Sequence, residues 1–127
     1  MLEKQLILSI VKHLPKTIHH QSMTFGSMSQ NGTPDRYFDG PDGDLWIEFK
    51  QLKSMPRSGI AIGNYSALQL RWMERRYANG NNVLGIVGLP DRNACIQRTP
   101  DVWKYGTEVI SAVSCINVAA YIISRLT

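Results

Sequence analysis

The part of the chain that decides the fold reads Gly32-Thr33-Pro34-Asp35-Arg36-Tyr37-Phe38, passes through an acid-rich turn over residues 39–44, and ends Leu45-Trp46-Ile47-Glu48-Phe49-Lys50. The turn holds glycine, proline and aspartate, whereas both flanks carry aromatic and apolar side chains. That pattern predicts two short strands joined by a tight polar loop, a β-hairpin. Both the fold class and the candidate site follow from this hairpin.

The predicted register of the hairpin brings two carboxylates and an ammonium group to one place. Pairing Phe38 with Leu45 sets Asp35 opposite Glu48. Lys50 lies two residues further along the second strand, on the same side as Glu48, because strand side chains alternate with a period of two. Adjacent carboxylates repel each other and add nothing to ordinary sheet stability. A divalent metal ion would remove the repulsion, so the arrangement indicates a metal site.

Length and composition describe a globular protein with a mild excess of base. The 127 residues predict one domain over residues 1–127, and hydrophobic and charged fractions of 43% and 19% are typical of soluble proteins. The net charge of +4 and the pI of about 9.3 favour a polyanionic partner. Basic residues concentrate just after the hairpin, at Lys50, Lys53, Arg57, Arg71, Arg75 and Arg76. That position favours nucleic acid as the partner.

The cysteines and the apolar segments do not indicate export or membrane insertion. Cys95 and Cys115 lack metal-ligand spacing, which predicts buried or free thiols in a reducing cytoplasm. Lys4 and Lys12 interrupt the apolar positions near the N-terminus, so we expect no signal peptide. The uncharged run Val109–Ser124 is shorter than a bilayer span and contains serines, which predicts a buried helix and no membrane contact.

The remaining segments predict a small α/β domain. Apolar residues recur at helical spacing from Leu2 to Leu14, and Pro15 ends that helix. The other expected elements are, in chain order, a strand over Met23–Met28, a basic Gly/Ser/Pro-rich loop over Lys53–Asn64 near the functional end of the hairpin, a helix from a Ser66 N-cap to Asn79-Gly80, strands over Asn82–Leu89 and Ala94–Gln97, and a final helix that begins at Thr107. The side chains expected in the core from that final helix are Val109, Ile110, Val113, Ile116 and Ile123.

In this order the motifs resemble those of a known nuclease group. The matching residues are Pro34-Asp35, Glu48-Phe49-Lys50, and Ser66 through Gln69, which are followed by a glycine and a hydrophobic strand. Glu3 matches an N-terminal acidic position more loosely. From Leu2 to Leu89, the chain resembles the PD-(D/E)xK nuclease superfamily and, within it, the VRR-Nuc (virus-type replication–repair nuclease) family.

The resemblance implies a restriction-endonuclease-like core, a small mixed β-sheet flanked by helices, in which the helix that carries Gln69 packs beside the hairpin. It also implies a metal-dependent phosphodiesterase. Small stand-alone members are associated with dimers that cut branched DNA, and a domain this small makes a homodimer the expected state. The resemblance further suggests a phage or other mobile-element origin, and hence the cytoplasm of a bacterial or phage-infected cell. Residues 91–127 match no motif of the family.

For phosphodiester hydrolysis, the hairpin would supply a site for Mg²⁺ or Mn²⁺. Asp35 and Glu48 are the expected oxygen ligands, with the backbone carbonyl of Phe49 as a third. Lys50 would orient or deprotonate the attacking water, or neutralise charge in the transition state, and the sequence leaves these roles open. An aspartate of the turn over residues 39–44 is a competing ligand.

Two further side chains are expected to support this chemistry. Gln69 would hold a water or a phosphate by hydrogen bonds, and its alternative is an exposed helix residue. Glu3 would bind a second metal or its water, and its alternative is an acid that stabilises the helix dipole. Contacts that position the nucleic-acid backbone without reading its sequence are expected from Arg36, Lys53, Arg57 and Arg75.

The sequence therefore predicts a metal-dependent, structure-selective DNA endonuclease, similar to a Holliday-junction resolvase, that acts in replication, recombination or repair. A second interpretation is a DNA-binding or interaction protein that keeps the fold without turnover, although the joint presence of Asp35, Glu48 and Lys50 speaks against it. A third is a nuclease that acts on RNA or on specific duplex sequences. No segment resembles a sequence-reading module.

Overall fold

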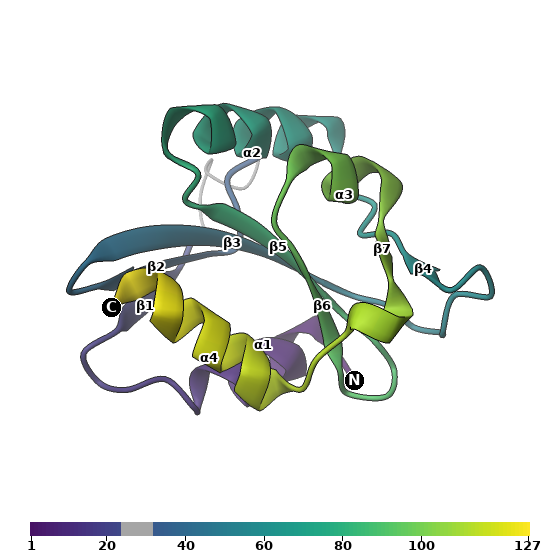
Figure 1. Ribbon diagram of the computed structural model, residues 1–127, viewed down its shortest axis with the longest axis horizontal. Helices are drawn as coiled ribbons and strands as arrows, with labels where there is room; N and C mark the ends of the chain where they lie inside the picture. The colour runs from purple at the N-terminus through teal and green to yellow at the C-terminus, as the bar shows by residue number, and fades with distance from the viewer. Residues whose placement is uncertain (24–31) are drawn as a thin grey trace.

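Within residues 1–23 and 32–127, which are those that the computed structural model describes, five strands form one mixed sheet (Figure 1). The strands are β1 (His19–Ser22), β2 (Arg36–Gly40), β3 (Gly43–Gln51), β5 (Val83–Gly88) and β6 (Ala94–Gln97), and they lie in that order across the sheet. β3 and β5 run parallel, whereas all other neighbours in this sheet run antiparallel. A parallel pair requires a crossover, which a helix between these two strands provides.

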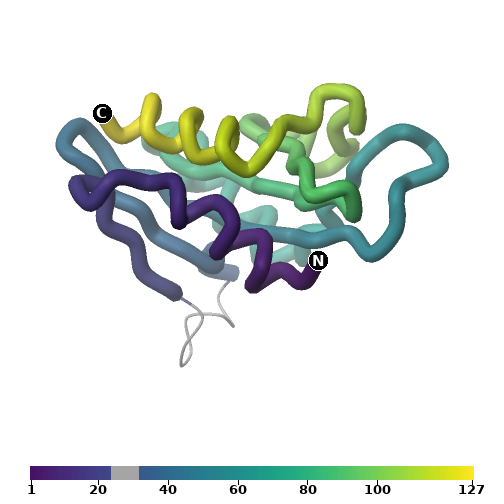
Figure 2. The backbone as a smooth tube through the Cα atoms, turned by 90° about the horizontal axis from the view of Figure 1, so that it is seen from below, coloured from purple at the N-terminus to yellow at the C-terminus, as the bar shows by residue number. Residues whose placement is uncertain are grey.

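Helices cover both faces of this sheet. Their bounds are Glu3–Val11 for α1, Ala67–Gly80 for α2, Pro100–Tyr105 for α3 and Cys115–Leu126 for α4. α1 and α4 lie side by side on one face, as Figures 1 and 2 show, while α2 and α3 cover the other face. Two short strands, β4 (Ile60–Ala61) and β7 (Thr107–Glu108), pair in a separate antiparallel ribbon, and a 3-10 turn, η2 (Val109–Ser111), follows β7. The predicted α/β class is confirmed.

The predicted hairpin consists of β2 and β3, and its register is the predicted one. Phe38 pairs with Leu45, and the pairing continues to Gly40 opposite Gly43. The turn is therefore tighter than the expected residues 39–44, because residues 39, 40, 43 and 44 all take part in the strand ladder.

The side chains of β3 alternate between the two faces of the sheet. Leu45, Ile47 and Phe49 are fully buried on the face covered by α1 and α4. Glu48 and Lys50 point to the other face, where both contact a side chain of α2. The alternation thus separates a core face from a polar face on the same strand.

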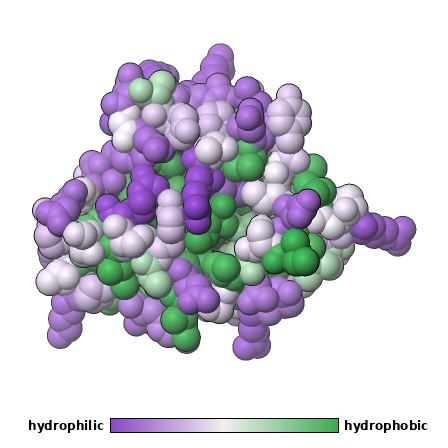
Figure 3. All heavy atoms as spheres, in the orientation of Figure 1, coloured by the Kyte–Doolittle hydropathy of each residue, from purple (hydrophilic) through white to green (hydrophobic). Residues whose placement is uncertain are grey.

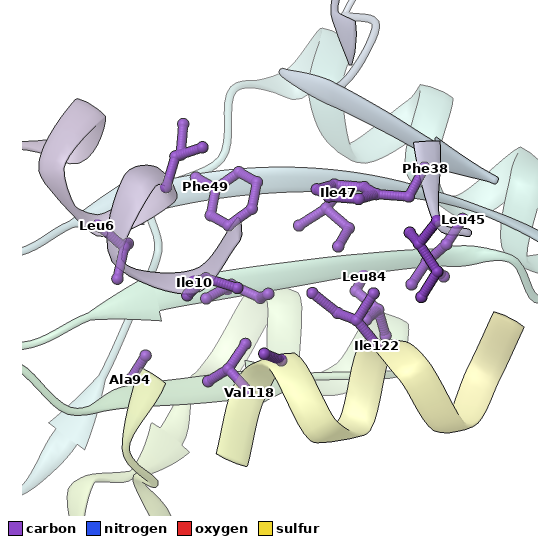
Figure 4. Packing of buried hydrophobic residues seen from close by; sticks show 14 of the residues in the cluster. Leu6, Ile10, Phe38, Leu45, Ile47, Phe49, Leu84, Ala94, Val118 and Ile122 are labelled. Atoms are coloured by element: carbon purple, nitrogen blue, oxygen red, sulfur yellow. The ribbon is translucent and has the colours of Figure 1, made fainter. Parts of the chain in front are cut away.

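Two hydrophobic clusters hold these layers together. The cluster in Figure 4 joins the sheet to α1 and α4, and its labelled members are Leu6, Ile10, Phe38, Leu45, Ile47, Phe49, Leu84, Ala94, Val118 and Ile122. On the opposite face, a smaller cluster includes Tyr65, Met73, Val87 and Trp103. A fully buried large apolar side chain contributes about 1.5–3 kcal/mol, so packing on both faces fixes β3 firmly between the helix layers.

α2 begins at its predicted N-cap and ends at its predicted stop. Ser66 Oγ accepts the backbone N–H of Gln69 at 3.1 Å, and a cap of this kind is worth about 1 kcal/mol. At the other end, Asn81 has a left-handed backbone with φ 50°, and its N–H donates to the carbonyls of Arg76 and Tyr77. The outer surface of α2, at the top of Figure 3, is mostly hydrophilic.

The predicted start of the last helix is wrong, as is part of its predicted core. Residues 107–111 form β7 and η2 because the chain here pairs with β4, and α4 begins only after Ser114, whose Oγ accepts the Asn117 N–H at 3.3 Å. Ile110 and Ile116 are 86% and 59% exposed rather than buried. The buried side of α4 consists of Val118, Ala119, Ile122 and Leu126.

Two other elements differ from the prediction. The strand expected over Met23–Met28 falls, apart from Met23, outside the described residues, and the first described strand is β1. α3 was not predicted, although a proline at its first position and the buried Trp103 are typical of a short packed helix. In the described part of the chain, no helix has the length and apolar character needed to cross a bilayer.

Candidate active site

The two carboxylates of the hairpin meet where β2 begins, near the carboxyl end of β3. Strand pairing begins with Arg36 opposite Ile47, so Asp35 lies just outside the ladder. The N–H of Asp35 donates to Glu48 Oε1 at 3.1 Å, and Asp35 Oδ2 accepts the N–H of Phe49 at 3.0 Å. These two hydrogen bonds hold both acids at one edge of β3, so their predicted proximity is confirmed.

Gln69 and Lys50 complete a hydrogen-bonded cluster with the acids. Gln69 Nε2 donates to Glu48 Oε2 at 3.0 Å, and Gln69 Oε1 accepts from Lys50 Nζ at 3.1 Å. Lys50 Nζ also lies 3.5 Å from Glu48 Oε2. The hairpin and α2 therefore bring the predicted catalytic residues, Asp35, Glu48, Lys50 and Gln69, into one group, while their catalytic roles stay predictions.

Burial gives the carboxyl group of Glu48 an unusual proton affinity. Glu48 is only 3% exposed. Loss of hydration, followed by the nearby negative charge of Asp35, raises the pKa of Glu48 to about 8, although the ammonium of Lys50 opposes the shift. Ionising Glu48 is therefore costly in the folded protein, and an added positive charge at this edge would reduce that cost.

Glu3 approaches the site from the first turn of α1. Partial burial and the charge of Asp35 raise the pKa of Glu3, while the ammonium of Lys50 lowers it. Glu3 and Asp35 border a cavity of about 200 Å³, whose wall also includes Ser22 and Arg36. The structure thus places Glu3 beside Asp35, where it faces the site in addition to standing at the start of a helix, and its role as a metal ligand stays a prediction.

The donor atoms at this edge fit a hard divalent cation. Asp35 and Glu48 offer carboxylate oxygens. The N–H of Phe49 points to Asp35, and a strand residue directs its carbonyl to the same edge as its N–H, so the Phe49 carbonyl faces that edge too. Oxygen donors of this kind suit Mg²⁺ or Mn²⁺. Across residues 1–23 and 32–127 no three His, Cys, Asp or Glu side chains form a ready ligand group. Mg²⁺ in proteins usually keeps several water ligands beside one or two carboxylates.

The acid-rich turn lies at the opposite end of β3. Asp44 accepts a hydrogen bond from the Tyr37 hydroxyl at 2.8 Å and another from the Asn82 side-chain amide. Asp44 and Glu48 are four positions apart along β3, a span of about 13 Å. The aspartates of the turn therefore do not belong to the carboxylate cluster, which argues against the alternative that one of them competes for the metal.

The structure brings one of the four predicted nucleic-acid contacts to the site. Arg36 borders the cavity described above, with Nη1 3.1 Å from His20 Nδ1. Lys53 and Arg57 are exposed on the loop that follows β3, and Arg75 is exposed on α2. None of the four side chains is buried in the core. Their contact with nucleic acid stays a prediction.

The sequence pattern did not single out Tyr65, which lies beside the site, or Gln97, to which Tyr65 is bonded. Tyr65, which is 7% exposed, lies next to the N-cap of α2, and its ring centroid is 5.7 Å from Lys50 Nζ. Its hydroxyl donates to Gln97 Oε1 at 2.7 Å. The sequence signal that could have indicated the Tyr65 contact is Gly85, because a glycine inside a buried strand often marks the close approach of another group.

The fold is restriction-endonuclease-like, as predicted. Among solved structures the chain is similar to Hjc, a Holliday junction resolvase from the archaeal hyperthermophile Archaeoglobus fulgidus, with a TM-score of 0.56 and 13% sequence identity. The match covers 94% of this chain and 96% of that one. No family model and no curated protein matches the sequence. The VRR-Nuc assignment therefore stays a prediction.

Proposed function

We propose that this protein is a divalent-metal-dependent endonuclease of the PD-(D/E)xK superfamily, of the VRR-Nuc kind, that cuts branched DNA. The observation that carries the proposal is the single hydrogen-bonded cluster of Asp35, Glu48, Lys50 and Gln69. Two adjacent carboxylates, one of them deeply buried, disfavour folding on their own because each loses hydration and repels the other. A cation bound by both carboxylates would offset this repulsion, which is why the pair supports a metal site.

Each residue of the cluster has a task that its contacts support. Asp35 and Glu48, with the carbonyl of Phe49, would hold Mg²⁺ or Mn²⁺. When bound, such a cation makes a coordinated water more acidic and offsets charge on the phosphate. Lys50 lies 3.5 Å from Glu48 and would stabilise the negative charge that develops on the phosphate, while Gln69 keeps the carboxylate and the ammonium in register.

The proposed substrate rests on charge and on the structural neighbour. The protein carries a net charge of +4, and Arg36, Lys53 and Arg57 are placed on or after the strands that form the site. The similar solved structure is that of a Holliday junction resolvase. We infer that the substrate is four-way or otherwise branched DNA, and that two copies act together because a symmetric pair can meet two strands at once.

Cleavage of labelled four-way junction, flap, nicked and linear duplex DNA tests the proposal. Each DNA is incubated with Mg²⁺, Mn²⁺ or EDTA and with wild type, Glu48→Ala or Lys50→Ala. Lys16→Ala serves as the matched control, because Lys16 is an exposed lysine between α1 and β1. Matched RNA versions of the substrates are included.

We expect wild type and Lys16→Ala to cut branched DNA with either metal, and both site variants to cut none. If wild type binds these DNAs but does not cut them, the protein is a DNA-binding protein and the nuclease proposal fails. Faster cutting of RNA would change the substrate class, and equal cutting of every DNA would remove the structure selectivity while keeping the chemistry.

A further inference from the structure

We infer that Tyr65 is a positioning residue that fixes the Lys50 ammonium beside Glu48, and that Gln97 anchors Tyr65 for this purpose. The inference rests on the proposed nuclease function and adds two residues to its machinery. Tyr65 is 7% exposed and Gln97 is fully buried, so both act through Lys50 rather than by touching the DNA.

A glycine creates the space that the Tyr65 ring occupies. Glu48, Gly85 and Gln97 lie side by side on β3, β5 and β6, because Gly85 pairs with both of the others. A Cβ atom on Gly85 would come within 2.0 Å of the Tyr65 hydroxyl oxygen, and one on Gly63 would come within 2.6 Å of the ring. The tyrosine therefore lies across Gly85 and spans the distance from the acidic cluster to Gln97.

Gln97 holds the hydroxyl end of the tyrosine in a fixed direction. Its Oε1 accepts the Tyr65 hydroxyl at 2.7 Å. Its Nε2 donates to the Ala61 carbonyl at 3.1 Å and to Thr107 Oγ1 at 3.2 Å, and its backbone carbonyl accepts the indole N–H of Trp103 at 2.7 Å. A buried amide with these partners has one favourable orientation, so α3 and the β4–β7 ribbon support the placement of Tyr65.

The ring end of the tyrosine meets Lys50. The ammonium lies 5.7 Å from the ring centroid, within the range of a cation–π contact. Glu48 and Gln69 contact the same ammonium at 3.5 Å and 3.1 Å. A lysine side chain has many rotamers in solution, and three contacts from different elements restrict it to one position. The Lys50 side chain remains 23% exposed, so a substrate can still reach the ammonium.

The tyrosine keeps its proton in this environment. Burial, followed by the negative charge of Glu48, raises the pKa of Tyr65. The hydroxyl therefore stays a hydrogen-bond donor to Gln97 at physiological pH. The positioning contact does not depend on ionisation of the phenol.

Single-turnover cleavage of a four-way junction with Mg²⁺ tests the inference, with junction affinity measured separately in EDTA. The variants are Tyr65→Leu, which removes the ring, and Tyr65→Phe, which keeps it. Tyr77→Leu is the matched control, because Tyr77 belongs to the same apolar cluster and packs edge-to-face on Trp103, at 5.9 Å between ring centroids. All proteins are assayed below their measured unfolding temperatures.

We expect Tyr65→Leu to lower the cleavage rate on the order of 10- to 100-fold while the junction affinity changes less than about twofold, because a displaced catalytic group slows chemistry more than binding. Tyr65→Phe keeps the ring but loses the bond to Gln97, so its rate should lie between those of wild type and Tyr65→Leu. Tyr77→Leu should cut like wild type. A folded Tyr65→Leu protein that cuts at the wild-type rate would overturn the inference.

A second measurement separates this inference from the proposed function. The ring current of Tyr65 should shift the NMR resonances of the Lys50 ε-methylene group, and the shift should persist in Tyr65→Phe and disappear in Tyr65→Leu. If wild type cuts no DNA but the shift behaves in this way, the nuclease proposal fails and the positioning contact stands. If wild type shows no such shift, the positioning contact fails whatever the activity.

Discussion

Gln69 and Glu48 meet between α2 and β3, with 3.0 Å separating the amide nitrogen of one from the carboxylate oxygen of the other. The same glutamine closes the capping box of α2, because its Oε1 accepts the N–H of Ser66 at 2.9 Å and its own N–H donates to Ser66 Oγ at 3.1 Å. One residue therefore both starts the helix and orients the buried acid. Formation of α2 and assembly of the candidate site are coupled at this point.

Substitutions at Gln69 and Ser66 should separate these two tasks. Ser66→Ala removes the side-chain cap and should lower the free energy of unfolding by about 1 kcal/mol, but it leaves Gln69 in place, so cleavage should persist. Gln69→Ala should lower both stability and cleavage. Chemical denaturation and single-turnover cleavage measure the two effects, and equal loss of cleavage in both variants would show that Gln69 acts only through the helix.

Neutralising the buried acid should stabilise the metal-free protein. Glu48→Gln removes a charge that has lost its hydration and lies beside Asp35, and we expect the free energy of unfolding in EDTA at pH 8 to rise by about 1–3 kcal/mol. The same variant should lose the increase in melting temperature that Mn²⁺ gives wild type. Glu108→Gln, at an exposed glutamate, is the control and should change neither property. A Glu48→Gln protein that Mn²⁺ still stabilises would argue against Glu48 as a ligand.

The raised pKa of Glu48 gives the metal-free protein a defined pH dependence. The folded state binds the Glu48 proton with a pKa of about 8 rather than the ordinary 4.5, so the folded state holds more protons than the unfolded state between these values. The stability contributed by this group is therefore full below pH 4.5 and is lost as the pH rises through about 8. Unfolding in EDTA at pH 5 and pH 8 should show wild type losing stability relative to Glu48→Gln. Mn²⁺ affinity should change in the opposite direction and tighten with rising pH, because the cation binds the ionised acid.

The hairpin and its acids could be predicted from the sequence because the signals are local. A polar turn between two apolar runs sets the register, and the period of two then sets which side chains share a face. Asp35, Glu48 and Lys50 follow from that register alone. Gln69 was added through the family resemblance, which implies that the helix with the Ser66-to-Gln69 motif packs beside the hairpin.

Contacts between distant segments could not be predicted in this way. Tyr65 meets Gln97 only after β5 and β6 have joined the sheet, and no local pattern links the two residues. The last helix was misplaced for a similar reason, because Thr107 enters a strand through its pairing with Ala61. Apolar side chains after Thr107 have helical spacing, but the distant strand determines the backbone.

A methyl group at Gly85 should disturb the site without touching it. The added Cβ would lie 2.0 Å from the Tyr65 hydroxyl oxygen, so Gly85→Ala should displace the ring and lower the free energy of unfolding by about 1–3 kcal/mol. Gly43→Ala is the matched control, because a Cβ there would have its closest contact at an ordinary 3.5 Å. Thermal unfolding of both variants measures the difference. Equal melting temperatures would contradict the tight packing of Tyr65 on β5.

The central claim is that Asp35 and Glu48 form a metal-dependent phosphodiesterase site, and the most direct test is single-turnover cleavage of a labelled four-way junction as Mg²⁺ is titrated. The proteins compared are wild type, Asp35→Asn and Asp42→Asn, the last an exposed aspartate in the turn at the far end of the hairpin. Wild type and Asp42→Asn should cut with the same Mg²⁺ dependence, while Asp35→Asn should lose about 100-fold or more of the rate. Cleavage by Asp35→Asn at the wild-type rate, or wild-type cleavage that persists in EDTA, would contradict the claim.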